Sequence, residues 1–153
     1  MNRRNFIATA AVAVAVHPIA PALAASTLPA VEVFKNPYCG CCEAWVAHLR
    51  AAGFPVEVTV VEDTAPVRKR YGISDKLSSC HTGVVSGYAL EGHVPASDVK
   101  RLLAAKPTAA GLAVPGMPTG SPGMEAGGRK DPFDVLLVDK SGRTSVYASY
   151  NRS

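Results

Sequence analysis

Residues 31–53 read Val-Glu-Val-Phe-Lys-Asn-Pro-Tyr-Cys-Gly-Cys-Cys-Glu-Ala-Trp-Val-Ala-His-Leu-Arg-Ala-Ala-Gly. The alternation over 31–35 predicts a strand, and the Asn-Pro-Tyr that follows ends it. Residues 42–52 suit a helix, which Gly53 ends. Because residues 56–61 alternate again, the stretch predicts a β-α-β unit with its loop at the carboxyl end of the first strand. The cysteines therefore lie where the helix begins.

The rest of the chain predicts a short sequence of further elements. These are a helix over 65–71, a single strand over 84–90, a helix over 95–105, a Gly/Pro-rich loop over 107–132, and a hairpin of 134–139 with 144–150. Together they predict an α/β sandwich, with a small mixed β-sheet flanked by helices and one long loop.

The N-terminus has the three parts of an export signal. Arg3 and Arg4 precede an apolar run over 6–16, and a small-residue Ala-Leu-Ala follows at 22–24. The apolar run is about half the roughly 20 residues needed to span a bilayer, so we expect no permanent membrane anchor. We therefore predict a signal peptide over 1–24 and a single domain over 25–153. The paired arginines resemble a twin-arginine signal, with ordinary secretion left open.

Length and charge exclude several classes of protein. A chain of 153 residues, 48% hydrophobic and 18% charged, is one modest globular domain. The net charge is +4, and removal of Arg3 and Arg4 lowers it to +2, so we expect no nucleic-acid partner. The sequence also lacks a phosphate-binding glycine loop or a hydrolase motif.

All four cysteines lie in the predicted mature domain, at positions 39, 41, 42 and 80. Outside the cytoplasm, two structural disulfides would be the default interpretation. Three thiols within four residues do not suit a framework that joins distant segments, so the cysteines indicate chemistry instead.

Two kinds of chemistry fit this cysteine group. Cys39 and Cys42 form a C-x-x-C at a helix start, where the helix dipole lowers thiol pKa values, as in thioredoxin-like redox sites. A dithiol exchanger has no need of Cys41, whereas thiolates that bind soft ions such as Cu(I) or zinc would use it. Zinc is the less favoured ion, because the sequence lacks a second C-x-x-C or Cys/His pair.

A second group of candidate ligands follows later in the chain. It comprises Cys80-His81 and the histidine of Glu91-Gly92-His93-Val94-Pro95. A single strand over 84–90 would place Cys80 and His93 at opposite ends. His48 lies on the first helix and is expected to face solvent.

Several motifs in this order resemble the CopG-type periplasmic metal-binding proteins, over about residues 30–150. They are Asn36-Pro37-Tyr38-Cys39-Gly40-Cys41-Cys42, Cys80-His81-Thr82, Gly87-Tyr88, Glu91-Gly92-His93-Val94-Pro95, and the Pro/Gly/Met-rich residues 114–125. The resemblance implies a thioredoxin-like fold, a role in copper resistance, and a cysteine-bridged copper cluster. It implies thiolate ligands at Cys39, Cys41, Cys42 and Cys80, and imidazole ligands at His93 and, with less support, His81.

Two functions stay open at this point. The favoured one is a periplasmic copper-binding protein with a multinuclear Cu(I) site, which sequesters copper or cycles it between Cu(I) and Cu(II). Its expected partners are copper ions, with other periplasmic copper-handling proteins as an open question. The alternative is a thioredoxin-like thiol-disulfide oxidoreductase that uses Cys39 as nucleophile and Cys42 as resolving thiol. Whether the protein is an enzyme is also open.

Overall fold

The computed structural model describes residues 27–152, so the predicted signal peptide lies outside the described residues. The helices and strands follow the order β1 (Val31–Lys35), α1 (Gly40–Ala51), β2 (Val56–Val60), α2 (Ala65–Arg70), β3 (His81–Val85), β4 (Tyr88–Glu91), α3 (Ala96–Ala105), β5 (Gly111–Ala113), β6 (Phe133–Val138) and β7 (Thr144–Tyr150). Two single 3-10 turns, η1 (Asp75–Leu77) and η2 (Ala126–Gly128), lie between them.

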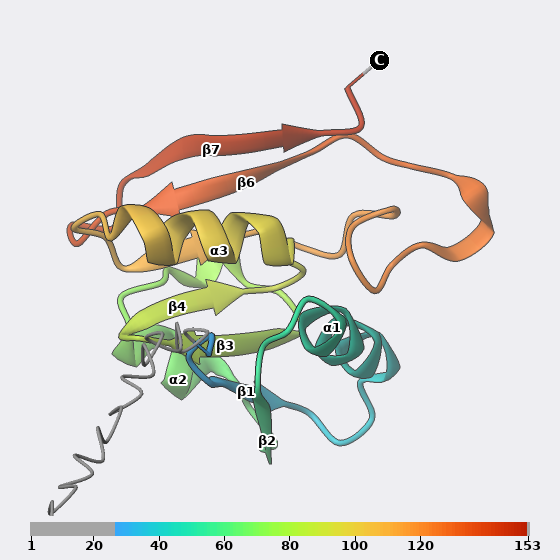
Figure 1. The fold of residues 1–153 in the computed structure, drawn as a ribbon, viewed down its shortest axis with the longest axis horizontal. Helices are drawn as coiled ribbons and strands as arrows, with labels where there is room; N and C mark the ends of the chain where they lie inside the picture. The colour runs from blue at the N-terminus through green and yellow to red at the C-terminus, as the bar shows by residue number, and fades with distance from the viewer. Residues whose placement is uncertain (1–26, 153) are drawn as a thin grey trace, which may run out of the picture.

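Within residues 27–152, all seven strands form one sheet in the order β2-β1-β3-β4-β5-β6-β7 (Figure 1). The β1/β2 and β4/β5 pairs are parallel and the other four pairs are antiparallel. The predicted mixed α/β class is therefore confirmed. The sheet is larger than the small one predicted, because the middle of the chain supplies two more strands than the sequence indicated.

The predicted single strand over 84–90 is wrong. The chain turns at Ser86 and Gly87, which have φ angles of 48° and 83°, and Val85 pairs with Tyr88 on either side of them. Positive φ at both central residues is the geometry of a two-residue hairpin turn. The hairpin returns the chain to the end of the sheet from which it started.

The predicted loop over 107–132 also contains an unpredicted element, the short strand β5. It pairs with β4 so closely that a Cβ on Gly111 would lie 1.9 Å from the carbonyl oxygen of Ala89. Glycine is needed at this position because any side chain would clash with the neighbouring backbone. Residues 114–125 carry neither helix nor strand.

Helices cover both faces of the sheet. On one face α1 and α3 bury Trp45, Leu49 and Leu102 against strand residues that include Leu90 and Leu112. On the other face, the segment after α2 contributes Ile73 to a second hydrophobic cluster. Its buried members are Ile73, Ala89, Ala110, Ala113 and Val138. Neighbouring strand residues belong to different clusters, as the two-residue period of a strand requires. No helix among the described residues is long and apolar enough to cross a membrane.

Candidate metal centre

Helix α1 begins immediately after the turn that ends β1, two residues earlier than the sequence predicted. Cys39 is its N-cap residue, and Cys41 and Cys42 lie in its first turn. Cys42 is fully buried, whereas Cys39 and Cys41 are half-buried. The three cysteines therefore lie at the positive end of the helix dipole, which favours negatively charged sulfur.

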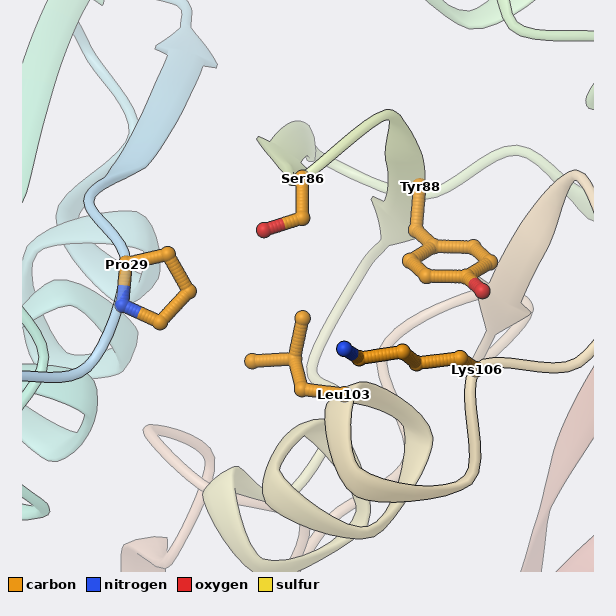
Figure 2. Close-up of a pocket in the computed structure, with 5 residues that line it drawn as sticks. All are labelled: Pro29, Ser86, Tyr88, Leu103 and Lys106. Atoms are coloured by element: carbon orange, nitrogen blue, oxygen red, sulfur yellow. The ribbon is translucent and has the colours of Figure 1, made fainter. Parts of the chain in front are cut away.

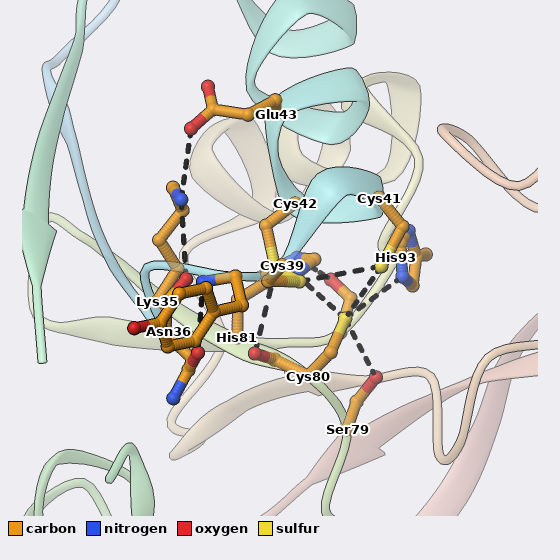
Figure 3. Close-up of a disulfide and its surroundings, with 12 residues drawn as sticks. Lys35, Asn36, Cys39, Cys41, Cys42, Glu43, Ser79, Cys80, His81 and His93 are labelled. Carbon is orange, nitrogen blue, oxygen red and sulfur yellow. Dashed lines mark hydrogen bonds and ion pairs between the residues drawn. A yellow bond between two sulfur atoms is a disulfide. The ribbon is translucent and has the colours of Figure 1, made fainter. Parts of the chain in front are cut away.

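The four sulfur atoms form a compact group, in which all of them lie within 4.8 Å of one another (Figure 3). Cys39 and Cys42 are joined in a disulfide, and Cys41 and Cys80 are free thiols. The Sγ atoms of Cys39 and Cys41 are 3.4 Å apart, and those of Cys41 and Cys80 are 3.6 Å apart. Cys80, which is distant in sequence, is thus brought beside the start of α1.

Two imidazole rings meet the sulfur of Cys80. Its Sγ lies 3.2 Å from Nδ1 of His81 and 3.2 Å from Nε2 of His93 (Figure 3). Both histidines are fully buried. Donors on one ion, with bond lengths of about 2.0 Å to nitrogen and 2.3 Å to sulfur, stand roughly 3.5 Å apart. The separations in the protein are close to that value.

Backbone carbonyl groups fix the tautomer of each ring. Nε2–H of His81 donates to the Gly92 carbonyl at 2.9 Å, and Nδ1–H of His93 donates to the Pro122 carbonyl at 2.8 Å. A carbonyl oxygen can only accept, so each of these nitrogens carries the ring's proton. The opposite nitrogen of each ring then has a free lone pair, which faces Cys80. Metal-binding histidines are commonly oriented in this way.

The pKa values of these groups favour uncharged side chains in the absence of metal. Burial, together with the neighbouring His93, lowers the pKa of His81 to about 3, against the opposing effect of the hydrogen bond to Gly92. Burial also lowers the pKa of His93, against the opposing effects of Pro122 and Glu125. Burial, together with Cys41, raises the pKa of the Cys80 thiol to about 12. Two lone pairs therefore face a thiol that has only one proton to donate.

The structure brings all six predicted site residues together. They form two groups, Cys39-Cys41-Cys42-Cys80 and Cys80-His81-His93, within which the candidate ligand atoms lie within 4.8 Å of one another. Cys80 and His93 do not lie at opposite ends of a strand, because the β3–β4 hairpin returns His93 to the start of β3. That these residues act as ligands remains a prediction.

The sequence predicts that His48 faces solvent, but in the structure this side chain is only partly exposed. It is half-buried, and its Nε2 accepts a hydrogen bond from the backbone N–H of Ala96 at 3.0 Å. Burial lowers the pKa of His48, consistent with a neutral ring at this position. His48 thus stabilises the start of α3 and is not part of the donor set.

Sequence reasoning missed two features that shape the site. The ring of Trp45 packs on His81 with 4.3 Å between centroids, and its Nε1–H donates to the Val94 carbonyl. The loop over 114–125 lies against α1, since a Cβ on Gly123 would come 2.8 Å from the backbone nitrogen of Trp45. The position of Trp45 near the start of α1 is a sequence signal that could have predicted the first feature. No sequence signal predicts that the loop over 114–125 places the Pro122 carbonyl beside His93.

A pocket of about 470 Å³ lies at the far end of the β3–β4 hairpin, where the chain turns. Pro29, Ser86, Tyr88, Leu103 and Lys106 line it (Figure 2). None of these residues is a cysteine, methionine or histidine. The pocket therefore offers no soft donor and is distinct from the cysteine cluster.

Two solved structures resemble the chain over most of its length. They are form 1 and form 2 of a copper resistance protein CopG, each 46% identical to the chain, with TM-scores of 0.76 and 0.77. The match covers 80% of this chain and 98% of each of those chains. The chain belongs to the CopG family. The family resemblance predicted from the sequence motifs is confirmed.

This CopG-family chain was also compared with protein-family models and with curated proteins. Residues 77–124 match the family described as "Protein of unknown function, DUF411". This segment contains Cys80, His81 and His93 and ends within the loop that follows β5. No curated protein matches the chain.

Proposed function

We propose that this CopG-family protein binds copper in the periplasm and contributes to copper resistance. Cys41, Cys80, His81 and His93 bind Cu(I), and Cys39 and Cys42 join them when their disulfide is reduced. The names of the two related structures support copper as the ion. The predicted signal peptide supports the periplasm as the compartment.

The observation that carries this proposal is the convergence of two imidazole lone pairs on the sulfur of Cys80. The thiol has one proton, so one lone pair lacks a hydrogen-bond donor in the metal-free protein. A bound cation satisfies both lone pairs and the sulfur at once. Sulfur with imidazole is a donor set suited to copper and zinc.

The compact group of four sulfur atoms supports a site for more than one ion. The two overlapping groups offer six ligand atoms, whereas one tetrahedral ion uses four. The Sγ of Cys41 lies 3.4 Å from that of Cys39 and 3.6 Å from that of Cys80, so Cys41 is placed to share its sulfur between neighbouring ions. A cysteine-bridged cluster thus makes use of Cys41, which a plain C-x-x-C site leaves without a role.

The disulfide connects copper capacity to thiol redox state. A disulfide sulfur is not a thiolate ligand, so Cys39 and Cys42 bind copper only after two electrons and two protons have opened the bond. The oxidised protein offers two thiols and two imidazoles, and the reduced protein offers four thiols and the same imidazoles. This mixed set suits either sequestration of Cu(I) or cycling between Cu(I) and Cu(II).

The order β1-α1-β2-α2, followed by the β3–β4 hairpin and α3, supports a thioredoxin-like description of the first part of the fold. The same comparison raises the alternative function, a thiol-disulfide oxidoreductase using Cys39 and Cys42. That alternative accounts for the disulfide. It gives no role to Cys80 and the two oriented histidines, so we favour copper binding.

A titration of the metal-free protein with Cu(I) tests the proposal. Reduced, desalted protein lacking residues 1–24 is titrated anaerobically in the presence of a chromogenic Cu(I) chelator, and bound copper is quantified per chain. We expect His93→Gln to weaken copper retention at least about tenfold. His48→Gln is the matched control, because it alters a histidine outside the donor set and keeps an acceptor for Ala96. Wild-type protein that retains no copper against the chelator would disprove the proposal.

A further inference from the structure

Glu91 has a fully buried carboxylate and is not a member of the donor set. We infer that Glu91 is a positioning residue, which holds the Cys80-His81 dipeptide in its metal-binding geometry from the opposite face of the sheet. The inference rests on the proposed function in one respect, because it takes Cys80 and His81 to be ligands. The placement of Cys80 by Glu91 is a property of the metal-free protein, so it can be tested whether or not the protein binds copper.

The two oxygens of Glu91 bind the residues on either side of the dipeptide. Oε1 accepts a hydrogen bond from the backbone N–H of Ser79 at 2.7 Å, and Oε2 accepts one from the hydroxyl of Thr82 at 2.6 Å. The dipeptide is therefore fixed at both ends by a single side chain. Hydrogen bonds to an ionised acceptor are among the stronger ones in proteins.

The alternation of the strands places this carboxylate behind the site. A Cβ on Gly83 would contact the ring of Trp45, so Gly83 and, two residues earlier, His81 face α1. Thr82 faces the other way, and Glu91 is its direct partner on β4. Glu91 thus reaches the dipeptide from the α2 face without occupying the space in which the ligand atoms converge.

A buried arginine supplies the opposite charge. Nη1 of Arg68 lies 3.6 Å from Oε1 of Glu91, and Nη2 donates to Asp75 at 2.7 Å. Burial raises the pKa of Glu91, whereas Thr82, Ser79 and Arg68 act in the opposite direction. The short helix α2 therefore brings a cation to the Glu91 carboxylate, which contacts both flanks of Cys80-His81.

Stability alone does not explain such a pair. Replacement of a buried ion pair by apolar side chains is often neutral or stabilising, because desolvation of the two charges offsets their attraction. A chain that needed only a stable hairpin could use apolar residues at these positions. The arrangement is instead suited to a segment whose ligand atoms must stay in one geometry, as residues around metal ligands commonly ensure.

Three variants separate positioning from general stability. Glu91→Ala removes both hydrogen bonds. Glu91→Gln keeps them, since its amide oxygen accepts from Ser79 and its amide N–H donates to the Thr82 hydroxyl, while the charge is lost. Asp98→Ala is the matched control, because Asp98 is also a buried carboxylate, bonded to Tyr150 and Arg101 and not to the site.

Two properties of each variant are measured in addition to its urea midpoint of unfolding. The first is the alkylation rate of Cys80 relative to Cys41 in metal-free reduced protein, from peptide masses. The second is Cu(I) affinity by chelator competition. For Glu91→Ala we expect a changed rate ratio and a roughly 10- to 100-fold loss of affinity. Glu91→Gln should be less impaired than Glu91→Ala in both, because it keeps the two hydrogen bonds and loses only the charge opposite Arg68. Asp98→Ala should lower only the urea midpoint.

Three results would overturn the inference. These are a wild-type rate ratio in Glu91→Ala, an equal change in Asp98→Ala, or a Glu91→Gln protein as impaired as Glu91→Ala. If Glu91→Ala does not fold, Thr82→Val removes one of the two bonds, with the exposed Thr59→Val as its control, and the same comparison applies. If wild-type protein binds no Cu(I), the proposed function fails, while the Cys80 rate ratio still tests the positioning.

Discussion

Cys80 contacts more of the candidate ligands than any other residue of the cluster. Its sulfur touches Cys41, His81 and His93, and it belongs to both groups of ligand atoms. Loss of this sulfur should therefore disrupt both groups, whereas loss of Cys39 affects only one.

We expect Cys80→Ser to lower bound copper per chain more than Cys39→Ser does. The check is metal quantitation after anaerobic loading and desalting of the two variants. Both variants are reduced before loading, which leaves three thiols in each. Both replacements are of cysteine by serine and both positions are half-buried, so the comparison is matched. Equal copper content in the two variants would show that Cys80 has no special place in the site.

Trp45 provides an intrinsic probe of metal binding. It is the only tryptophan in the sequence, and its ring packs on the ring of His81. A metal bound to His81 changes the electronic surroundings of the indole, so we expect Trp45 emission to change during a copper titration. His81→Ala should abolish this response, and His48→Gln should retain it. An undiminished response in His81→Ala would mean that His81 is not a ligand.

The ligand candidates could be predicted because they are chemically distinctive side chains. Cysteine and histidine are few in this sequence, and their spacing relative to one helix start carried the prediction. The groups that orient them could not be predicted in the same way. A carbonyl such as that of Pro122 is common to every residue, and the role of Glu91 depends on a hairpin that the sequence interpretation missed.

At the scale of elements, the loop over 114–125 acts as a strap across α1. Its Pro122 carbonyl orients His93, and Gly123 comes so close to α1 that a Cβ would lie 2.8 Å from the nitrogen of Trp45. The φ angle of Gly123 is +86°, which side chains rarely adopt. Both the contact and the backbone angle therefore require glycine.

Gly123→Ala should displace the strap, with a loss of stability of about 1–3 kcal/mol and weaker copper retention. The matched control is Gly127→Ala, since Gly127 has a similar φ of +72° and no atom within 4 Å of an added Cβ. Urea unfolding and chelator competition measure the two effects. If Gly127→Ala proves as damaging as Gly123→Ala, backbone strain alone accounts for the loss.

The two mistakes in element prediction share a physical cause. Residues 84–90 resemble one strand because apolar residues stand on both sides of Ser86-Gly87. That dipeptide is also a turn signal, and in the structure the chain turns there. β5 is only three residues long and has no period of its own. In both places the pairing of strands distant in sequence decided the structure. The long helices and the C-terminal hairpin, whose patterns are local, were predicted within a few residues.

At the scale of the whole molecule, three buried or half-buried histidines make stability depend on pH. Burial lowers the pKa of His81 to about 3 and lowers the pKa of His93 and His48. In the unfolded chain these groups take up protons near pH 6.5. Protonation of these histidines therefore favours the unfolded chain as pH falls, because the three rings bind fewer protons in the folded protein over this range.

We expect the metal-free protein to lose stability as pH falls from 6.5 toward 5. The slope should reach about 1.4 kcal/mol per pH unit for each histidine that stays neutral in the folded state. Urea midpoints at pH 7.5, 6.0 and 5.0 provide the measurement. His81→Phe keeps a ring against Trp45 and cannot titrate, so its slope should be shallower. A midpoint that is constant over this range would contradict the expectation.

The bond between His93 and Pro122 has a consequence for how relatives of this protein are compared. The group that selects the tautomer of His93 is a main-chain oxygen, so substitution of residue 122 need not alter it. A sequence alignment compares side chains, so it would give residue 122 no special weight. It would instead detect Gly123, which allows the chain to approach the helix. Distant relatives are therefore better recognised by a glycine beside the first helix than by the identity of the residue that orients the histidine.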